Sequence, residues 1–254
     1  MKTIKIRQVT ALSLFSIYLI VKICFAISIV YVTRTNEYYS TTQKYLYLLD
    51  AGHGYAGTDC NNKSVMDTET GECFYEWEFN WEVREMLSKK LDSAGIKYVW
   101  VNTDKKSDLP LLQRAKKVNK IHSNLKHILI SIHANAAPKD ADNFETASGF
   151  EVYSSDFNRD GGYPDKKQFS DTIAKYLYEE IEKSFPEHTM RKSSRTGSYK
   201  EASYTILSST DCYAVLSENE FFTNRVIRKQ MKTQNFKRRV ATAHFNAIMR
   251  LESK

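Results

Sequence analysis

Short hydrophobic runs in this chain alternate with longer segments in which apolar positions recur at helical intervals. The runs predict buried strands at residues 45–49, 96–101, 127–132, 150–153, 204–207 and 213–217. The segments of helical spacing predict helices over residues 79–94, 109–122 and 166–184, and one or two helices over 225–251. Such alternation is typical of an α/β domain with a mostly parallel or mixed central sheet and helices on both faces.

Three of the expected strands are followed directly by polar blocks. Residues 50–54 read Asp-Ala-Gly-His-Gly, residues 131–135 read Ser-Ile-His-Ala-Asn, and residues 217–224 read Ser-Glu-Asn-Glu-Phe-Phe-Thr-Asn. Open α/β sheets place their chemistry at the carboxyl ends of the strands. We therefore expect His53, His133 and Glu218 to lie near one another at one edge of the sheet.

Two histidines and a carboxylate match the ligand set of a catalytic zinc ion, which keeps a fourth position for water. We expect Glu76 to be the carboxylate ligand, because it opens a helix and lies near the positive end of the helix dipole. Glu78 is two residues further on and points elsewhere, and Glu72 belongs to the preceding loop. Asp50 is expected to orient an imidazole from behind the ligands.

The first 33 residues are a targeting segment. A basic flank precedes residues 11–32, an apolar run of 22 residues that is long enough to cross a bilayer, which favours an uncleaved membrane anchor. A cleaved signal peptide remains the alternative, because residues 26–28 have a small residue at each end. Residues 34–43 are then a tether, and the domain at 44–254 is exported, either anchored facing the cell wall or periplasm or secreted after cleavage.

The composition fits one globular domain. With 254 residues, 42% of them apolar, the chain can bury one full-sized core, and no internal repeat is visible. The net charge is +7, but four of the cations lie in the first 33 residues, which contain no acid, so the rest of the chain carries only +3. No nucleic-acid motif accompanies this weak charge, and we expect a monomer that does not bind nucleic acid.

Cys60 and Cys73 flank a polar loop. In an exported protein this pair could close a loop of about 15 residues and stabilise the fold by roughly 3 kcal/mol. Two unpaired thiols are the alternative. A cysteine-based zinc site is not predicted, because neither cysteine has a Cys-x-x-Cys partner.

Four blocks in register resemble the zinc-dependent N-acetylmuramoyl-L-alanine amidases. That family's pattern runs Asp-Pro-Gly-His-Gly, Glu-x-x-x-Asn, Ser-Ile-His-Ala-Asn and Val-Leu-x-Glu-x-Gly-Phe-[Leu/Ile]-[Ser/Thr]-Asn. The corresponding segments here are 50–54, 76–80, 131–135 and 215–224. The likeness covers about residues 44–251, and it includes a Leu-x-x-Arg helix start near Arg114 and a Gly-x-Glu-x-Tyr strand at 149–153.

The resemblance implies that His53, Glu76 and His133 bind zinc and that Glu218 is the catalytic acid and base. It also implies the substrate, peptidoglycan, and the bond, the amide between the lactyl group of N-acetylmuramic acid and L-alanine. Zinc lowers the pKa of its bound water to roughly 7. Glu218 would accept a proton from that water and return it to the departing amine, a contribution of about 10²–10⁴-fold.

The chain departs from the family pattern near the expected base. Glu220 replaces a glycine and brings a second carboxylate close to Glu218, so it could compete for the same role. Asn135 and Arg195 are candidates for substrate binding, although a solvated basic loop is the alternative for Arg195. The other histidines are expected to be ordinary surface or core residues, and Trp77 and Trp81 to pack within the domain.

Three functions fit these observations. The first is a membrane-tethered or secreted amidase that trims the host cell wall, and the second is a lysis amidase encoded by a phage. The third is an inactive protein that only binds peptidoglycan, and the presence of all four expected functional residues argues against it.

Overall fold

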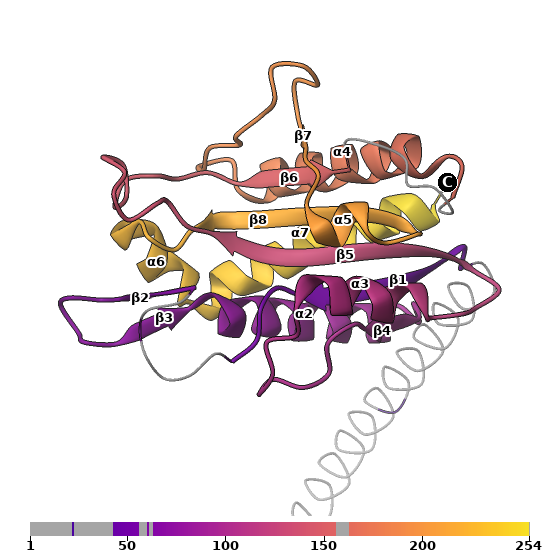
Figure 1. Cartoon of the computed structure of the whole chain (residues 1–254), viewed down its shortest axis with the longest axis horizontal. Helices are drawn as coiled ribbons and strands as arrows, with labels where there is room; N and C mark the ends of the chain where they lie inside the picture. The colour runs from indigo at the N-terminus through magenta and orange to yellow at the C-terminus, as the bar shows by residue number, and fades with distance from the viewer. Residues whose placement is uncertain (1–21, 23–42, 56–59, 61–62, 156–162, 254) are drawn as a thin grey trace, which may run out of the picture.

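The computed structural model describes residues 22, 43–55, 60, 63–155 and 163–253 (Figure 1). The expected membrane anchor, residues 11–32, lies outside the described residues except for Lys22. Among the helices of the described part, none is both long and apolar enough to cross a membrane.

The strands and helices follow the alternation expected from the sequence. The strands are β1 (Tyr45–Ala51), β2 (Ser64–Met66), β3 (Cys73–Tyr75), β4 (Tyr98–Trp100), β5 (Lys126–Asn135), β6 (Glu151–Ser154), β7 (Lys200–Glu201) and β8 (Tyr213–Phe221). The helices are α2 (Glu76–Ser93), α3 (Leu111–Asn119), α4 (Lys166–Ser184), α5 (Thr205–Ser208), α6 (Arg225–Met231) and α7 (Gln234–Glu252).

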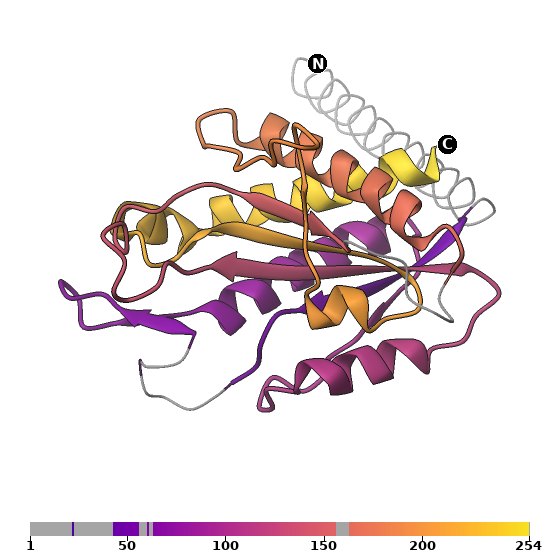
Figure 2. The ribbon, with the colours of Figure 1, turned by 45° about the horizontal axis from the view of Figure 1, so that its top comes forward.

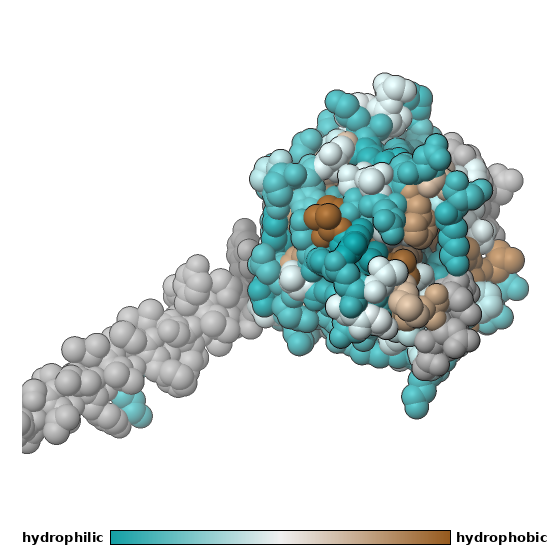
Figure 3. All heavy atoms as spheres, turned by 90° about the vertical axis from the view of Figure 1, so that its left-hand side faces the viewer, coloured by the Kyte–Doolittle hydropathy of each residue, from teal (hydrophilic) through white to brown (hydrophobic). Residues whose placement is uncertain are grey.

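Six strands form one mixed sheet in the order β4-β1-β5-β8-β6-β7. The neighbouring pairs β1/β4, β1/β5 and β5/β8 are parallel, whereas β6 runs antiparallel to β8. The carboxyl ends of β1, β5 and β8 therefore meet at one edge, the left-hand side of Figure 1. Figure 3 faces this edge, which is largely hydrophilic with several separate hydrophobic spots.

Helices cover both faces of the sheet (Figure 2). Alternate residues of β1 enter different cores: Tyr47 and Leu49 join a core with α2, α4 and α7, whereas Leu46 and Leu48 join one with α3 and α5. This division follows from the alternation of side chains along a strand. The expected α/β fold is confirmed.

The prediction of a strand at residues 204–207 is wrong. The segment forms the short helix α5, in which the amides of Leu207 and Ser208 both donate to the carbonyl of Tyr204, each at 2.8 Å. Ile206 and Leu207 are consecutive and both buried. A short apolar run does not by itself distinguish a strand from one turn of helix.

The loop before α2 contains a small hairpin that was not expected, made of β2 and β3. Cys73, the first residue of β3, forms a disulfide with Cys60, with Cα atoms 5.8 Å apart, so the cross-linked alternative is the one the structure contains. At the other end of the chain, residues 225–251 form two helices. Asn224 begins the first, because its side chain accepts hydrogen bonds from the amides of Val226 and Ile227.

Candidate functional site

The three expected metal ligands lie together. His53 follows β1, Glu76 is the first residue of α2 and His133 lies near the end of β5, and one ligand atom from each lies within 4.8 Å of the others. His133 Nδ1 is 3.1 Å from Glu76 Oε1, and His53 Nε2 is 3.4 Å from Glu76 Oε2. In the described part of the chain this is the one such group of three or more potential ligands.

The glycines on either side of His53 allow the chain to pass close to its neighbours. A Cβ atom on Gly52 would lie 2.2 Å from Cε1 of His133, and one on Gly54 would lie 2.1 Å from the carbonyl oxygen of Ser107. His53 itself has a φ of 60°, in the left-handed region that non-glycine residues rarely adopt. The Gly-His-Gly sequence is thus a steric requirement of this site.

Glu76 accepts hydrogen bonds from its own helix, α2, and from β5. Its Oε1 accepts hydrogen bonds from Asn80 Nδ2, at 3.3 Å, and from the amide of Ala134, at 3.2 Å. Asn80 lies one helical turn after Glu76 and also donates to the carbonyl of Gly52, at 3.0 Å. Burial alone would raise the pKa of Glu76, but the histidines and the amide of Ala134 lower it, so the carboxylate is ionised.

The carboxylate beside His53 is Asp108, not Asp50, and the expectation for Asp50 is wrong. Asp108 Oδ2 lies 3.8 Å from His53 Nδ1, and its interaction with that imidazole lowers the pKa of Asp108. Asp50 is buried and instead pairs with Arg114 Nη1, at 3.0 Å, and accepts a hydrogen bond from Ser131. Arg114 also binds Asp108, at 3.1 Å, and so links the two carboxylates. Asp50 therefore does not contact His53. It is linked to Asp108, the carboxylate beside His53, through the guanidinium of Arg114.

Glu218 lies beside His133. The two residues are Cα partners on the parallel strands β5 and β8, so their side chains emerge on the same face of the sheet. Oε2 of Glu218 is buried and has no hydrogen-bond partner among the described residues. Burial, together with the charges of Glu76 and Glu151, raises the pKa of Glu218 well above its ordinary value. The group is therefore a carboxyl with proton affinity suited to acid and base chemistry.

Glu220 does not share this position. Its Oε2 accepts a hydrogen bond from the amide of Gly149, at 2.7 Å, and its Oε1 lies 2.7 Å from His188 Nδ1. The backbone at Glu220 has a φ of 71°, which is easily adopted by the glycine that the family pattern has here. Both carboxylate oxygens of Glu220 thus contact groups other than the three proposed metal ligands. This arrangement favours Glu218 as the base.

The two candidates for substrate binding have different surroundings. Asn135 donates to Oε2 of Glu151, at 3.2 Å, close to Glu218 in the sheet. Arg195 has a side chain that is 63% exposed and pairs with Glu201 of β7. Glu201 lies on the edge strand of the sheet, and among the described residues no contact joins Arg195 to the three metal ligands. Sequence reasoning missed Glu151, although the Gly-x-Glu-x-Tyr strand was a signal for it.

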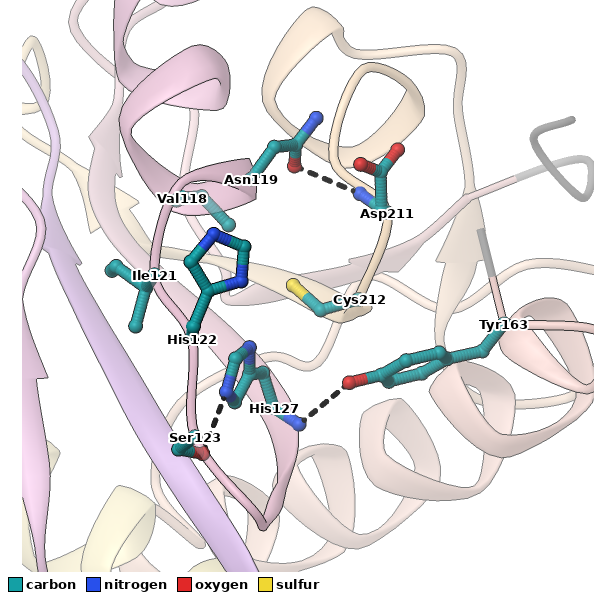
Figure 4. Close-up of a pocket in the computed structure, with 9 residues that line it drawn as sticks. All are labelled: Val118, Asn119, Ile121, His122, Ser123, His127, Tyr163, Asp211 and Cys212. Atoms are coloured by element: carbon teal, nitrogen blue, oxygen red, sulfur yellow. Dashed lines mark hydrogen bonds between the residues drawn. The ribbon is translucent and has the colours of Figure 1, made fainter. Parts of the chain in front are cut away.

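A cavity of about 250 Å³ lies at the opposite end of the sheet from the proposed metal ligands, where β5 and β8 begin (Figure 4). His122 and His127 both line it, and Nε2 of His127 lies 2.8 Å from the hydroxyl of Ser123. His244 is buried in the core against Ser217. These histidines are therefore ordinary surface and core residues, as expected, and so is His188, whose largely buried side chain contacts Glu220.

Trp77 and Trp81 pack within the domain, as expected. Trp81 is buried, and the guanidinium of Arg84 lies 3.9 Å from the centroid of its ring. Trp77 is half-buried and contacts Tyr55 edge to face, with ring centroids 6.0 Å apart. Trp81 is a core residue rather than a platform for sugar.

Fold and site together define an α/β domain with a candidate metal centre at the carboxyl edge of its parallel strands. Solved structures share this fold. An N-acetylmuramoyl-L-alanine amidase from Clostridium difficile 630 is 24% identical with a TM-score of 0.63, and the match covers 83% of this chain and 98% of that one. The amidase Ami1 from Mycobacterium smegmatis is 19% identical with a TM-score of 0.62, over 84% and 98% of the two chains.

Residues 48–250 match the family of N-acetylmuramoyl-L-alanine amidases, and the chain belongs to this family. The protein is accordingly a peptidoglycan amidase, a hydrolase of the amide bond between N-acetylmuramic acid and L-alanine. Among curated proteins, the uncharacterized protein YqiI of Bacillus subtilis (strain 168) is 24% identical over 200 residues, which are 79% of this chain and 81% of that protein.

Proposed function

We propose that the enzyme is a zinc-dependent amidase in which His53, Glu76 and His133 hold the ion and Glu218 transfers the proton. The observation that carries this proposal is the convergence of three ligand atoms within 4.8 Å, beside a buried carboxyl oxygen of Glu218 that lacks a hydrogen-bond partner in the described structure.

The donor set fits zinc. Two imidazoles and one carboxylate form the three-ligand arrangement of catalytic zinc sites, and amide hydrolysis requires no change of oxidation state. Zinc supplies Lewis acidity, which polarises a carbonyl and makes water more acidic. Asn80 and the amide of Ala134 orient the carboxylate of Glu76, and Asp108 lies beside the imidazole of His53, so the ligands are fixed before substrate arrives.

Glu218 supplies the proton transfers that hydrolysis requires. Its carboxylate accepts a proton from the attacking water, and the resulting carboxylic acid donates it to the nitrogen of L-alanine as the amide bond breaks. The surroundings that raise its pKa make the carboxylate a stronger base than an exposed glutamate. The acyl product leaves with a newly formed lactyl carboxylate, and the amine product is a stem peptide that begins with L-alanine.

Metal analysis tests the ligand assignment. The full chain, purified and analysed by elemental mass spectrometry, should contain about one zinc ion, because the three ligands meet only in the folded domain. His133→Ala should lose most of this zinc. Zinc well below one per chain in the wild type, or an unchanged content in His133→Ala, would contradict the assignment.

A muropeptide digest tests the reaction. Purified peptidoglycan treated with the zinc-loaded enzyme should release stem peptides that begin with L-alanine, detected by mass spectrometry. If zinc is bound and the wild type releases no such peptides while it still binds peptidoglycan, the protein is a binding module and the proposed function is wrong.

We further propose that residues 11–32 anchor the enzyme in the membrane with the catalytic domain outside the cytoplasm. The hydrophobic run and its basic flank support this proposal. Full-length protein should then remain in the membrane fraction, and protease added from outside should reach the domain. Recovery of a soluble chain that begins near residue 29 would show a cleaved signal peptide instead.

A further inference from the structure

Glu151 lies one strand beyond Glu218 in the sheet. It lies on β6 and is the Cα partner of Glu218 on β8, which in turn is the partner of His133 on β5. Paired residues on neighbouring strands emerge on the same face of a sheet. Glu151 therefore lies on the side of Glu218 that is away from the metal cluster.

Glu151 holds two cations at this position. Arg191 donates through Nε to Oε1 of Glu151, at 2.6 Å, and Lys200 donates through Nζ to the same oxygen, at 2.8 Å. The hydroxyl of Tyr153 and the amide of Asn135 donate to the other oxygen, at 2.5 and 3.2 Å. Burial alone would raise the pKa of Glu151, but Lys200, Tyr153 and Arg191 lower it, so the carboxylate is ionised.

The cations carry one more charge than Glu151 neutralises, and both reach the surface. The side chain of Arg191 is 39% exposed and that of Lys200 is 27% exposed, whereas that of Glu151 is 4% exposed. A guanidinium has five N–H donors. Within the described part of the chain, Arg191 donates hydrogen bonds through two of its groups, Nε to Glu151 and Nη1 to the carbonyl of Ser148, at 3.4 Å.

The two cations are also fixed in place before any ligand binds. Glu151 anchors both head groups, and the guanidinium of Arg191 lies 4.9 Å from the centroid of the Phe221 ring. A side chain that is already ordered loses less conformational entropy on binding than a free one. The arrangement is thus a preformed anion site beside the proposed base.

We propose that Arg191 and Lys200 form a subsite that binds a carboxylate of the stem peptide, with Glu151 as the residue that positions them. This inference rests on the proposed amidase function. In the substrate of that reaction, the lactyl carboxyl group of muramic acid forms the scissile amide and carries no charge. The carboxylates of the substrate therefore belong to the peptide. The carboxylate nearest to the scissile bond is the one on the residue that follows L-alanine.

The test compares two synthetic muramyl peptides that differ at one group. The residue after L-alanine carries a free carboxylate in one and the primary amide in the other. Full-length, zinc-loaded wild type should prefer the carboxylate in kcat/KM by about 10-fold or more, the effect of a charge-assisted hydrogen bond. Arg191→Gln and Lys200→Met should lose this preference mainly through KM, with kcat and zinc content near those of the wild type.

Two variants serve as controls. Lys200→Arg retains the positive charge and should retain the preference. Arg250→Gln removes a matched arginine, which is 35% exposed, pairs with Glu179 at 2.8 Å and lies over the ring of Tyr176, but belongs to the end of α7. Arg250→Gln should leave the preference unchanged. A loss of preference in Arg191→Gln that is not seen in Arg250→Gln is therefore specific to the subsite.

Two results would overturn the inference in distinguishable ways. Equal cleavage of both peptides by the wild type, or a preference that survives in both Arg191→Gln and Lys200→Met, would exclude the subsite and leave the amidase function standing. Cleavage of neither peptide by the zinc-loaded wild type would refute the proposed function, and the subsite would be refuted with it.

Discussion

His188 and Glu220 form a buried pair in which Nδ1 of the histidine lies 2.7 Å from Oε1 of the glutamate. Their side chains are only 5% and 1% exposed. The other oxygen of Glu220 accepts a hydrogen bond from the amide of Gly149. Glu220 thus ties β8 to two loops, whereas Glu218, two residues earlier, has a buried oxygen without such a partner in the described chain.

The two glutamates should respond differently to the same substitution. Glu218→Gln retains the size of the side chain but cannot accept a proton, so kcat should fall about 10²-fold or more with zinc still bound. Glu220→Gln should retain most of the turnover and lower the midpoint of thermal unfolding, because it weakens a buried contact to His188. Both are measured on purified peptidoglycan with parallel zinc analysis. If Glu218→Gln is fully active and Glu220→Gln is inactive, then Glu220 is the base and the assignment of Glu218 is wrong.

Gly52→Ala should remove the metal. The added Cβ would lie 2.2 Å from Cε1 of His133, so the imidazole has to move out of the cluster. Zinc content measured by elemental mass spectrometry should fall well below one per chain. Gly71→Ala is the control: although Gly71 has a positive φ of 71°, nothing lies within 4 Å of its added Cβ, so this variant should retain zinc. Equal zinc in wild type and Gly52→Ala would contradict the steric argument.

Glu151→Gln should shift the pH profile of the reaction. The negative charge of Glu151 contributes to the raised pKa of Glu218, so its removal lowers that pKa. Glu218 must be deprotonated to act as a base, and the acidic limb of kcat/KM should therefore move to lower pH. Glu180→Gln removes another largely buried, ion-paired glutamate, which belongs to α4, and should leave the limb in place. A shift to higher pH in Glu151→Gln would contradict the prediction.

The disulfide should stabilise the domain. Cys60→Ser removes the cross-link to Cys73, and the free energy of unfolding should fall by about 3 kcal/mol, the value expected for a loop of this length. Denaturant unfolding measures the difference. A reductant should reproduce the effect in the wild type and change nothing in Cys60→Ser. An unaffected wild type under full reduction would show that the cross-link adds no stability.

The sequence predicted the parts of the fold and site that depend on local pattern. The strand ends that carry His53 and His133 follow continuous apolar runs, and the helix at residues 166–184 has the bounds that its spacing predicted. Glu76 was correctly expected at the start of a helix near the histidines, because the first turn of α2 follows from the apolar face that begins at Phe79.

What the sequence did not predict depends on neighbours that are distant along the chain. Asp50 was expected beside an imidazole, but the pleat of β1 turns it toward Arg114, and Asp108 from another loop takes that place. The position of Glu151 beside Glu218 follows from the antiparallel pairing of β6 with β8, for which the sequence contains no local signal. The error at residues 204–207 arose because a short apolar run is compatible both with a strand and with one turn of helix.

The metal cluster joins β1, α2 and β5, and this has a thermodynamic consequence. An ion that binds His53, Glu76 and His133 together in the folded domain, and only weakly to the unfolded chain, shifts the folding equilibrium toward the folded state. At a free concentration 100 times its dissociation constant, such an ion adds about 2.7 kcal/mol. If the proposed zinc ion binds there, the melting temperature should rise with the free zinc concentration, and a medium poor in zinc should contain a smaller folded fraction of the enzyme.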